Sequence, residues 1–381
     1  MVIAGAVIAA SQITIAQAAP ALPARTPAQL LAQVRSDAKL PPLTGTVVET
    51  TSLGLPQLPR AADPTSLSSL ITGSHTVNLY YASPRHFRVQ VPQTMSETDA
   101  IRDGDTLWYW DSTKNAVTEY TWPKGALKAS DKRVKDQMDT GPVLTPQQAA
   151  NEVLKAVGKT TVVSVQSNVL VAGEPAYQLV LAPRDKRSLV GQVVIAIDGK
   201  YGVPLRLQVF AKGAKSPAFQ VGFTQIAFVT PAAANLQFTP PPGAKVKKVN
   251  LGGDIGQQAH QSGKSATPGN SGFGTYGSGW LSVAELPQSD ISMAGPLALP
   301  GGGAPAPGQS SSPQIGMGAL GGSSQEILHA LMLAAKPVSG PWGSGTLLTT
   351  SLMSMLITKG EVYVGAVEPS VLYAAVGHTS G

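Results

Sequence analysis

The chain has 381 residues, of which 43% are hydrophobic and only 13% charged, and it is rich in glycine (40) and proline (31). It is too apolar to be disordered throughout, so at least one hydrophobic core is present, and its length allows about two to three domains. The absence of cysteine excludes disulfides, thiolate metal sites, cysteine nucleophiles, c-type haem and lipid anchors on cysteine, while a net charge of +6 permits nucleic-acid binding without implying it.

The first segment of the chain has the character of an export signal. Residues 1–19 carry no charge and are about long enough to cross a bilayer, and Ala16-Gln17-Ala18 resembles an export cleavage site. No basic residue precedes the apolar run, because the first positive residue is Arg25. The segment is predicted to be a signal peptide or an N-terminal membrane anchor, and the alternative is a buried helix. We therefore expect an exported protein, on the extracytoplasmic face of the cell membrane or in a periplasm-like space.

The next part of the chain predicts a helix followed by an antiparallel meander. A short helix is expected at 26–36, with Pro27 as its first residue. From residue 43 onward the apolar period is two, which is typical of half-buried strands. The sequences at 103–105 and 111–115 have the composition of tight turns between such strands.

A second meander follows a helical break. Thr145 and Pro146 predict the start of a helix that runs to about residue 157, with Thr145 as its N-cap. Further strands are predicted at 162–171, 176–181, 192–198, 205–211 and 218–229. With the first meander this makes about ten strands, and a sheet of that size normally curls or closes.

The C-terminal part predicts a small second unit. The strand pattern stops after residue 244; residues 250–278 are predicted to be a disordered linker, and 279–381 a small α+β domain with a disordered Gly/Pro-rich insert at 295–322. Ordered segments of this unit are expected at 280–286, 325–335, 347–358, 361–367 and 369–376. The predicted fold class is α+β: a curved antiparallel half-barrel sheet with a helical lid, and this second unit after the linker.

A search for reactive groups finds no catalytic set, so no catalytic residue, metal or cofactor is predicted. The sequence has no nucleophile elbow and no Walker loop, and the G-x-G-x-x-G match at 272–277 follows a linker rather than a strand. Turn chemistry explains Asp103, Asp105 and Asp111 without a reaction. No two of the histidines are spaced as a metal pair, and these are His75, His86, His260, His329 and His378.

One basic stretch is a candidate electrostatic surface. It contains Lys124, Lys128, Lys132, Arg133 and Lys135. It is either a solvated loop or a contact for anionic lipid headgroups, where each cation is worth about 1 kcal/mol. Nucleic acid is not expected as a partner, because no aromatic side chains are interleaved with these cations.

The strands offer more apolar surface than one clear intervening helix can cover. A half-closed barrel with a helix as its lid would leave an apolar groove able to accept an acyl chain, although ordinary core packing explains the same alternation. The residues predicted from this alternation to line the cavity are Val77, Leu79, Phe87, Val89, Trp108, Trp110, Tyr177, Leu179, Leu205, Leu207, Phe219 and Phe223.

Three sequence motifs, taken in order, carry a resemblance to a known family. They are DGDTLWYWD at 103–111, IDGKYGVPLR at 197–206 and FTPPPGA at 238–244. Together with the order of meander, helix and meander, they resemble the LolA/LolB-like lipoprotein carrier superfamily, in particular its actinobacterial outer membrane lipoprotein carrier-type members, over residues 28–249. The resemblance implies an open half-barrel with a helical lid and an apolar cavity for lipid or lipoprotein acyl chains. The predicted domain therefore covers residues 26–249.

The C-terminal unit carries a second resemblance. GWLSV at 279–283 and VYVGAVEP at 362–369 are similar to the C-terminal domain of the MucB/RseB sigma-factor regulators. Those proteins pair a LolA-like domain with a small domain that contacts an anti-sigma factor. The Gly/Pro-rich insert and the sequence GPWGSG at 340–345 have no counterpart in that resemblance.

Two functions are therefore predicted. The first is a non-enzymatic, membrane-associated carrier or envelope sensor that binds acyl chains of lipids or lipoproteins. The alternative is a regulator that binds an anti-sigma factor in envelope-stress signalling. The expected partners are acyl chains, the membrane surface and, for the alternative, an anti-sigma factor.

Overall fold

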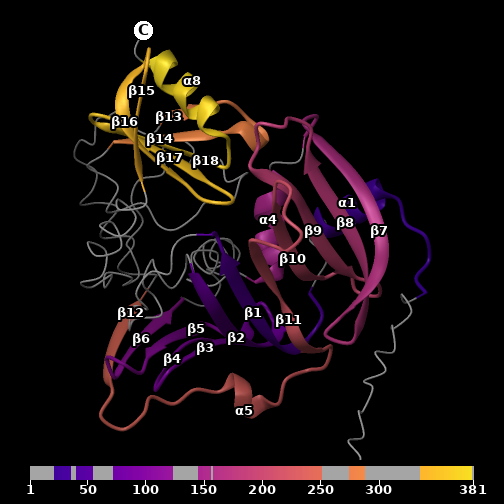
Figure 1. Ribbon diagram of the computed structural model, residues 1–381. Helices are drawn as coiled ribbons and strands as arrows, with labels where there is room; N and C mark the ends of the chain where they lie inside the picture. Colours follow the sequence, from indigo (N-terminus) through magenta and orange to yellow (C-terminus); the bar gives the residue numbers. More distant parts are fainter. Residues whose placement is uncertain are drawn as a thin grey trace, which may run out of the picture.

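The computed structural model describes residues 21–35, 40–54, 72–122, 145–155, 158–250, 274–287 and 335–379. These residues form a large curved sheet and a smaller second sheet (Figure 1). The strands of the large sheet are β1 (Leu43–Ser52), β2 (Thr72–Ser83), β3 (His86–Gln93), β4 (Ser96–Asp103), β5 (Thr106–Asp111), β6 (Ala116–Thr121), β7 (Thr161–Val171), β8 (Glu174–Pro183), β9 (Val190–Asp198), β10 (Pro204–Ala211), β11 (Phe219–Ala227) and β12 (Lys245–Asn250).

The large sheet joins two meanders through its first and eleventh strands. Its order is β12-β6-β5-β4-β3-β2-β1-β11-β10-β9-β8-β7, so β1 pairs with both β2 and β11. The sheet remains open, which confirms the predicted half-barrel. All neighbouring strands are antiparallel except β12, which runs parallel to β6 at one edge. β12 was not predicted, because the sequence KVKKVN lacks the apolar alternation of a half-buried strand.

Helix α1 (Pro27–Arg35) and helix α4 (Pro146–Lys155) begin with the same capping arrangement. The Thr145 hydroxyl accepts a hydrogen bond from the Gln148 amide at 3.2 Å, and the Gln148 side chain accepts one from the Thr145 amide at 2.8 Å. Thr26 and Gln29 repeat both bonds at α1. This reciprocal capping satisfies two otherwise unpaired donors and explains why both helices start where the threonine and proline predicted.

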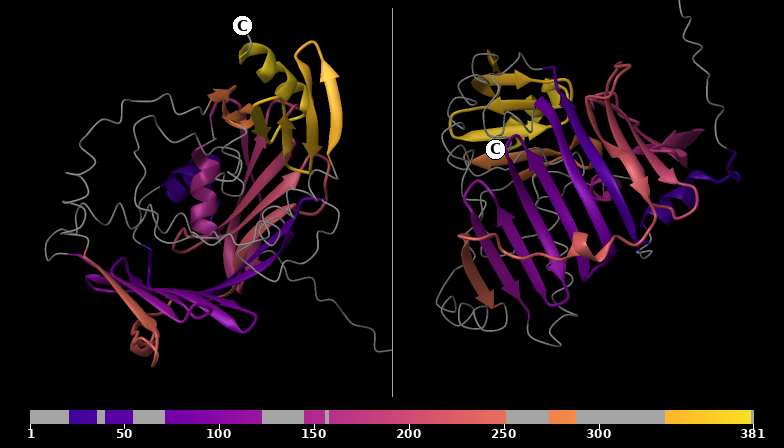
Figure 2. Two further views of the ribbon diagram at one scale, coloured as in Figure 1. Left: turned by 90° about the vertical axis from the view of Figure 1, so that its left-hand side faces the viewer. Right: turned by 90° about the horizontal axis from the view of Figure 1, so that it is seen from below.

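Two helices lie on one face of the large sheet, and a connecting segment crosses the other (Figures 1 and 2). The main contacts of α1 are with β7, β8 and α4, and those of α4 are with β10 and β11. We call the face that carries these helices the concave face and the opposite one the convex face. After β11 the chain crosses the convex face, where α5 (Ala233–Leu236) contacts β3 and β4, and it then returns to the sheet as β12.

The second sheet has its own core beneath helix α8 (Pro369–Thr379), around Leu356, Tyr363 and Leu372. Its order is β13-β14-β18-β17-β16-β15. The elements are β13 (Gly274–Tyr276), the short 3-10 helix η1 (Gly279–Leu281), β14 (Val283–Pro287), β15 (Lys336–Gly340), β16 (Gly343–Thr349), β17 (Ser354–Ile357) and β18 (Glu361–Gly365).

The second sheet differs from expectation in three elements. β13 lies in residues predicted to be linker, and β15 was not predicted. The single segment expected at 347–358 is two strands, because a turn at 350–353 separates them. In that turn the Thr350 hydroxyl accepts a hydrogen bond from the Met353 amide at 3.0 Å.

Several predictions fall outside the described residues. They are the apolar segment 1–19, the basic stretch from Lys124 to Lys135, most of the predicted linker 250–278, the insert 295–322, the helix expected at 325–335 apart from its last residue, and the side chains of His260, His329 and His378.

Candidate functional site

The concave face over strands β7 to β11 is a filled hydrophobic core. Ala149 and Val153 of α4 and Leu30 of α1 are fully buried there, packed in one cluster with Leu207 and Leu179 of the sheet. The two helices thus act as a lid over this half of the sheet. A filled core leaves no room for a ligand, so the site has to be sought on the other half.

The concave face over strands β2 to β6 carries apolar side chains, several of which are only half-buried. Pairing across the strands aligns them in rows perpendicular to the chain. The first row consists of Leu79, Val89, Ala100, Tyr109 and Thr118. The second row consists of Tyr81, Phe87, Arg102, Leu107 and Tyr120. We call these two sets the apolar rows.

The apolar rows lie beyond the principal contacts of both lid helices, which are with β7, β8, β10 and β11. Leu79, Val89, Leu107 and Tyr109 accordingly keep intermediate exposure. Phe87 and Tyr120 of the second row are buried, like the core residues under the helices. Half-buried apolar side chains gathered on one curved face are typical of binding sites.

The tyrosines of the apolar rows have raised pKa values because they are partly buried. Burial raises the pKa of Tyr81 and of Tyr109, where the charge of Asp111 adds to the effect. Burial also raises the pKa of Tyr120 to about 12, with a smaller contribution from Tyr109. Removal from water disfavours the charged phenolate, so the three shifts follow from the partial burial of these rings among their neighbours.

One cation is built into the second row. Arg102 is only 1% exposed, its guanidinium lies 5.1 Å from the Trp122 ring centroid, and its Nε donates to the Gly104 carbonyl at 3.3 Å. Stacking on the indole and bonding to the backbone hold this side chain in place. Arg102 is therefore a fixed polar group in the middle of an otherwise apolar row, between Phe87 and Leu107.

The convex face of the same strands is chemically different. A ladder of hydrogen bonds runs from Thr46 to Asn78 at 3.0 Å, on to Gln90 at 3.2 Å and from Gln90 to Glu97 at 2.8 Å. Beside it Asp99, fully buried, pairs with Arg88, and burial raises the pKa of Asp99 against the lowering effect of that cation. Polar pairing dominates the convex face of β2 and β3, and on β5 the convex Trp108 and Trp110 are already in contact with Phe238, so the acyl-binding candidate is the concave face.

Most of the predicted cavity residues lie on one face. Nine of the twelve are buried, and the six on β8, β10 and β11 belong to the filled core rather than to the apolar rows. Leu79 and Val89 are half-buried members of the first row. The ten that share the concave face are Val77, Leu79, Phe87, Val89, Tyr177, Leu179, Leu205, Leu207, Phe219 and Phe223.

Trp108 and Trp110 lie on the convex face instead. Their ring centroids are 6.2 and 6.4 Å from that of Phe238, in the segment that crosses this face next to α5. Sequence reasoning placed these tryptophans in the cavity and left out Tyr109, which points to the concave side between them. Alternation shows that Tyr109 faces away from the tryptophans. It does not show which side is concave, because that depends on sheet curvature and on where α1 and α4 pack.

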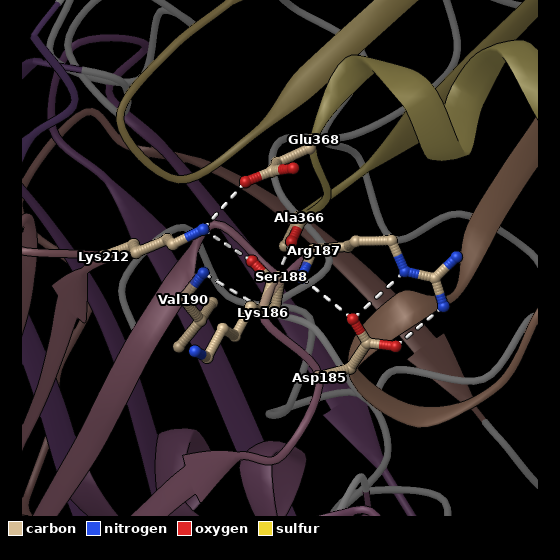
Figure 3. Close-up of polar contacts among 8 residues, drawn as sticks. All are labelled: Asp185, Lys186, Arg187, Ser188, Val190, Lys212, Ala366 and Glu368. Carbon is tan, nitrogen blue, oxygen red and sulfur yellow. Dashed lines mark hydrogen bonds and ion pairs between the residues drawn. The ribbon is translucent and has the colours of Figure 1, made fainter.

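The two sheets are joined at the loop between β8 and β9 (Figure 3). The Leu189 amide donates to the Ala366 carbonyl at 2.9 Å, and the Glu368 amide donates to the Arg187 carbonyl at 2.8 Å. Lys212 forms an ion pair with Glu368 at 2.8 Å. These hydrogen bonds and the ion pair hold the segment between β18 and α8 against the large sheet.

A buried side chain reinforces the same junction. Trp280 is 2% exposed, and its Nε1 donates to the Thr161 hydroxyl at 2.8 Å. Leu352 also packs into the core of the large sheet, and the Ser351 amide donates to the Leu53 carbonyl at 2.9 Å. Both side chains and backbone thus connect the second sheet to the filled half of the first.

A hollow of about 400 Å³ lies at this junction, between the β8–β9 loop, η1 and α8. The Asp185–Arg187 pair stands at its wall, with Arg187 donating to both carboxylate oxygens at 3.1 and 2.7 Å. These bonds lower the pKa of Asp185 to about 2. The two opposite charges neutralise each other, so the hollow has no net charge to select a ligand.

Within the described ranges, no three histidine, aspartate or glutamate side chains gather as metal ligands. None of the helices found in that part of the chain combines the length and hydropathy needed to cross a bilayer.

Comparison with known proteins gives matches at the level of structure. No family model and no curated protein matches the chain. A chain of the complex structure of Pseudomonas aeruginosa MucA/MucB is 11% identical, with a TM-score of 0.39, over 92% of this chain and 96% of that one. A crystal structure of MucB is 14% identical, with a TM-score of 0.35, over 91% and 94%.

A LolA superfamily protein from Nitrosomonas europaea is 10% identical, with a TM-score of 0.22, and the match covers 56% of this chain and 99% of that one. The solved structures that match thus include the two protein groups named by the sequence resemblance.

Proposed function

We propose that this protein is a non-enzymatic, extracytoplasmic binding protein that holds acyl chains of lipids or lipoproteins against the apolar rows. The observation that carries the proposal is the asymmetry of the concave face. The lid helices fill the half over β7 to β11, whereas the half over β2 to β6 lies beyond their main contacts and keeps half-buried apolar side chains, among them Leu79, Val89 and Tyr109.

The energetics of this face suit an acyl chain. Each methylene moved from water to an apolar surface gains about 0.8 kcal/mol, so a long chain binds without a specific polar contact. The raised pKa values of Tyr81, Tyr109 and Tyr120 fit such a surface, because they result from the partial burial of these rings in the rows. Export is supported by the uncharged run at residues 1–19, which would deliver the protein to the membrane surface.

The test uses neighbouring residues of β3 that face opposite sides. Val89→Lys places an ammonium within the first row, between Leu79 and Ala100, whereas Gln90→Lys places the same group on the convex face, beside Glu97. Delipidated protein is titrated with the fluorescent fatty acid cis-parinaric acid. The proposal expects saturable binding by the wild type and Gln90→Lys, and at least tenfold weaker binding by Val89→Lys.

The control for folding is the circular dichroism spectrum and melting temperature of both variants. Equal binding by two folded variants would contradict the site. Absence of saturable binding by the wild type would contradict the function.

A second candidate function is regulation through an anti-sigma factor. The second sheet has its own core and joins the filled half of the large sheet, so it contributes nothing to the apolar rows and is available for a partner. Deletion of residues 279–381 is expected to change envelope-stress transcription while acyl-chain binding persists. An unchanged stress response would contradict this role.

A further inference from the structure

The edge strand β12 places lysines at one end of the apolar rows. Because Lys247 lies opposite Thr118, it continues the first row, and Val249, opposite Tyr120, continues the second. Val249 packs against Tyr120 and Trp122, which confirms that odd-numbered residues of β12 face the concave side. Lys245 lies opposite Ala116 and shares that face.

Lys245 and Lys247 are both exposed, and among the described residues neither has a carboxylate partner. Lys248 faces the convex side, where it lies 3.7 Å from Glu119. A carboxylate does stand near Lys245 on the concave face, since Asp111 lies opposite Ala116, but Asp111 is already paired with Lys114 at 2.7 Å. The concave end of β12 is therefore a site of net positive charge.

The strand itself is held in place by specific contacts. The Lys245 amide donates to the Asn115 carbonyl at 2.9 Å, and the Asn115 side chain donates to the Gly243 carbonyl at 3.1 Å. Lysines on an exposed edge strand also prevent pairing with another strand, and Lys248 on the convex side can fulfil that role equally well. Protection of the edge does not require lysines in line with the apolar rows.

We infer that β12 is the headgroup end of the binding site, where Lys245 and Lys247 hold an anionic headgroup while the acyl chain lies along the apolar rows towards β2. This inference rests on the proposed function and adds the substrate class, an acyl ligand with a carboxylate or phosphate head. Five strand spacings separate β12 from β2, or about 24 Å, a length suited to one extended long acyl chain. Lysine is well suited to such a head as a point charge.

The experiment compares an acid with its uncharged ester, using the full delipidated chain. The probes are cis-parinaric acid and its methyl ester, and the variants are Lys245→Gln, Lys247→Gln, the double variant, and Lys248→Gln as control. The wild type is expected to bind the acid more tightly than the ester. Each concave substitution should weaken acid binding about fivefold, and both together about 30-fold, with ester binding and Lys248→Gln unchanged.

The outcomes distinguish failure of the headgroup site from failure of acyl-chain binding. Equal binding of acid and ester by the wild type, or equal losses for Lys247→Gln and Lys248→Gln, would overturn the headgroup site while leaving acyl binding intact. If neither probe binds the wild type, the proposed function fails and the inference fails with it. Phosphatidic acid and inorganic phosphate are then added separately as competitors at constant ionic strength, to test the source of the anion. If phosphatidic acid displaces the probe and inorganic phosphate does not, the result supports an acyl ligand. If inorganic phosphate displaces the probe and phosphatidic acid does not, the result refutes it.

Discussion

The junction between the sheets includes one buried hydrogen bond whose strength can be measured. Trp280 and Thr161 are 2% and 5% exposed, and the indole nitrogen donates to the hydroxyl at 2.8 Å. A buried bond of this kind contributes about 0.5–1.5 kcal/mol, and a donor or acceptor left unpaired costs about 1–3 kcal/mol. Trp280→Phe removes the donor and part of the buried volume, so we expect it to lower the free energy of unfolding by about 2–3 kcal/mol.

A double-mutant cycle isolates the bond from the lost volume. The cycle combines Trp280→Phe with Thr161→Val, and urea unfolding followed by circular dichroism measures each free energy. We expect a coupling of about 1 kcal/mol. Trp342→Phe is the matched control, because Trp342 stacks on Tyr373 within the second unit. The effects of Trp342→Phe and Thr161→Val on the free energy of unfolding should therefore be additive. A Trp280–Thr161 coupling below about 0.3 kcal/mol would refute the claim that this bond ties the sheets together.

Two further predictions test the concave face. A Cβ on Gly45 would lie 2.8 Å from two ring carbons of Phe223 and from the Gln225 carbonyl oxygen, so Gly45→Ala should destabilise the fold by about 1–3 kcal/mol; an unchanged melting temperature would contradict this packing. Burial raises the pKa of Tyr120 in the folded protein to about 12, whereas a tyrosine in the unfolded chain ionises near pH 10. The unfolded chain therefore loses this proton first, and the free energy of unfolding should fall as pH rises from about 10 to 12. In Tyr120→Phe that fall should be smaller and one late-titrating phenol should disappear from the ultraviolet titration; phenols that all titrate near pH 10 in the folded wild type would contradict the burial.

The sequence predicted those elements whose signals are local. Thr145 and Pro146 marked the start of α4 because capping involves residues three positions apart. The turn at 103–105 was recognisable because Gly104 adopts a φ of 60°, which favours glycine. Alternation likewise identified most strands of both meanders.

Features that depend on distant pairing could not be predicted. Trp108 and Trp110 alternate with Tyr109 as clearly as any residues in the chain, but which side is concave follows from sheet curvature and from where α1 and α4 pack. β12 was not predicted because an exposed edge strand can form without the apolar alternation of a half-buried strand. Its position beside β6 results from the chain crossing the convex face. The junction through Trp280 and Thr161 joins residues 119 positions apart.

Native mass spectrometry of the full chain, purified without detergent, tests the central claim most directly. The account predicts that the protein retains a non-covalent adduct with the mass of an acyl lipid, that organic extraction removes it, and that added fatty acid restores one such adduct per chain. A protein that carries only its own mass, and takes up no fatty acid after extraction, would contradict the account.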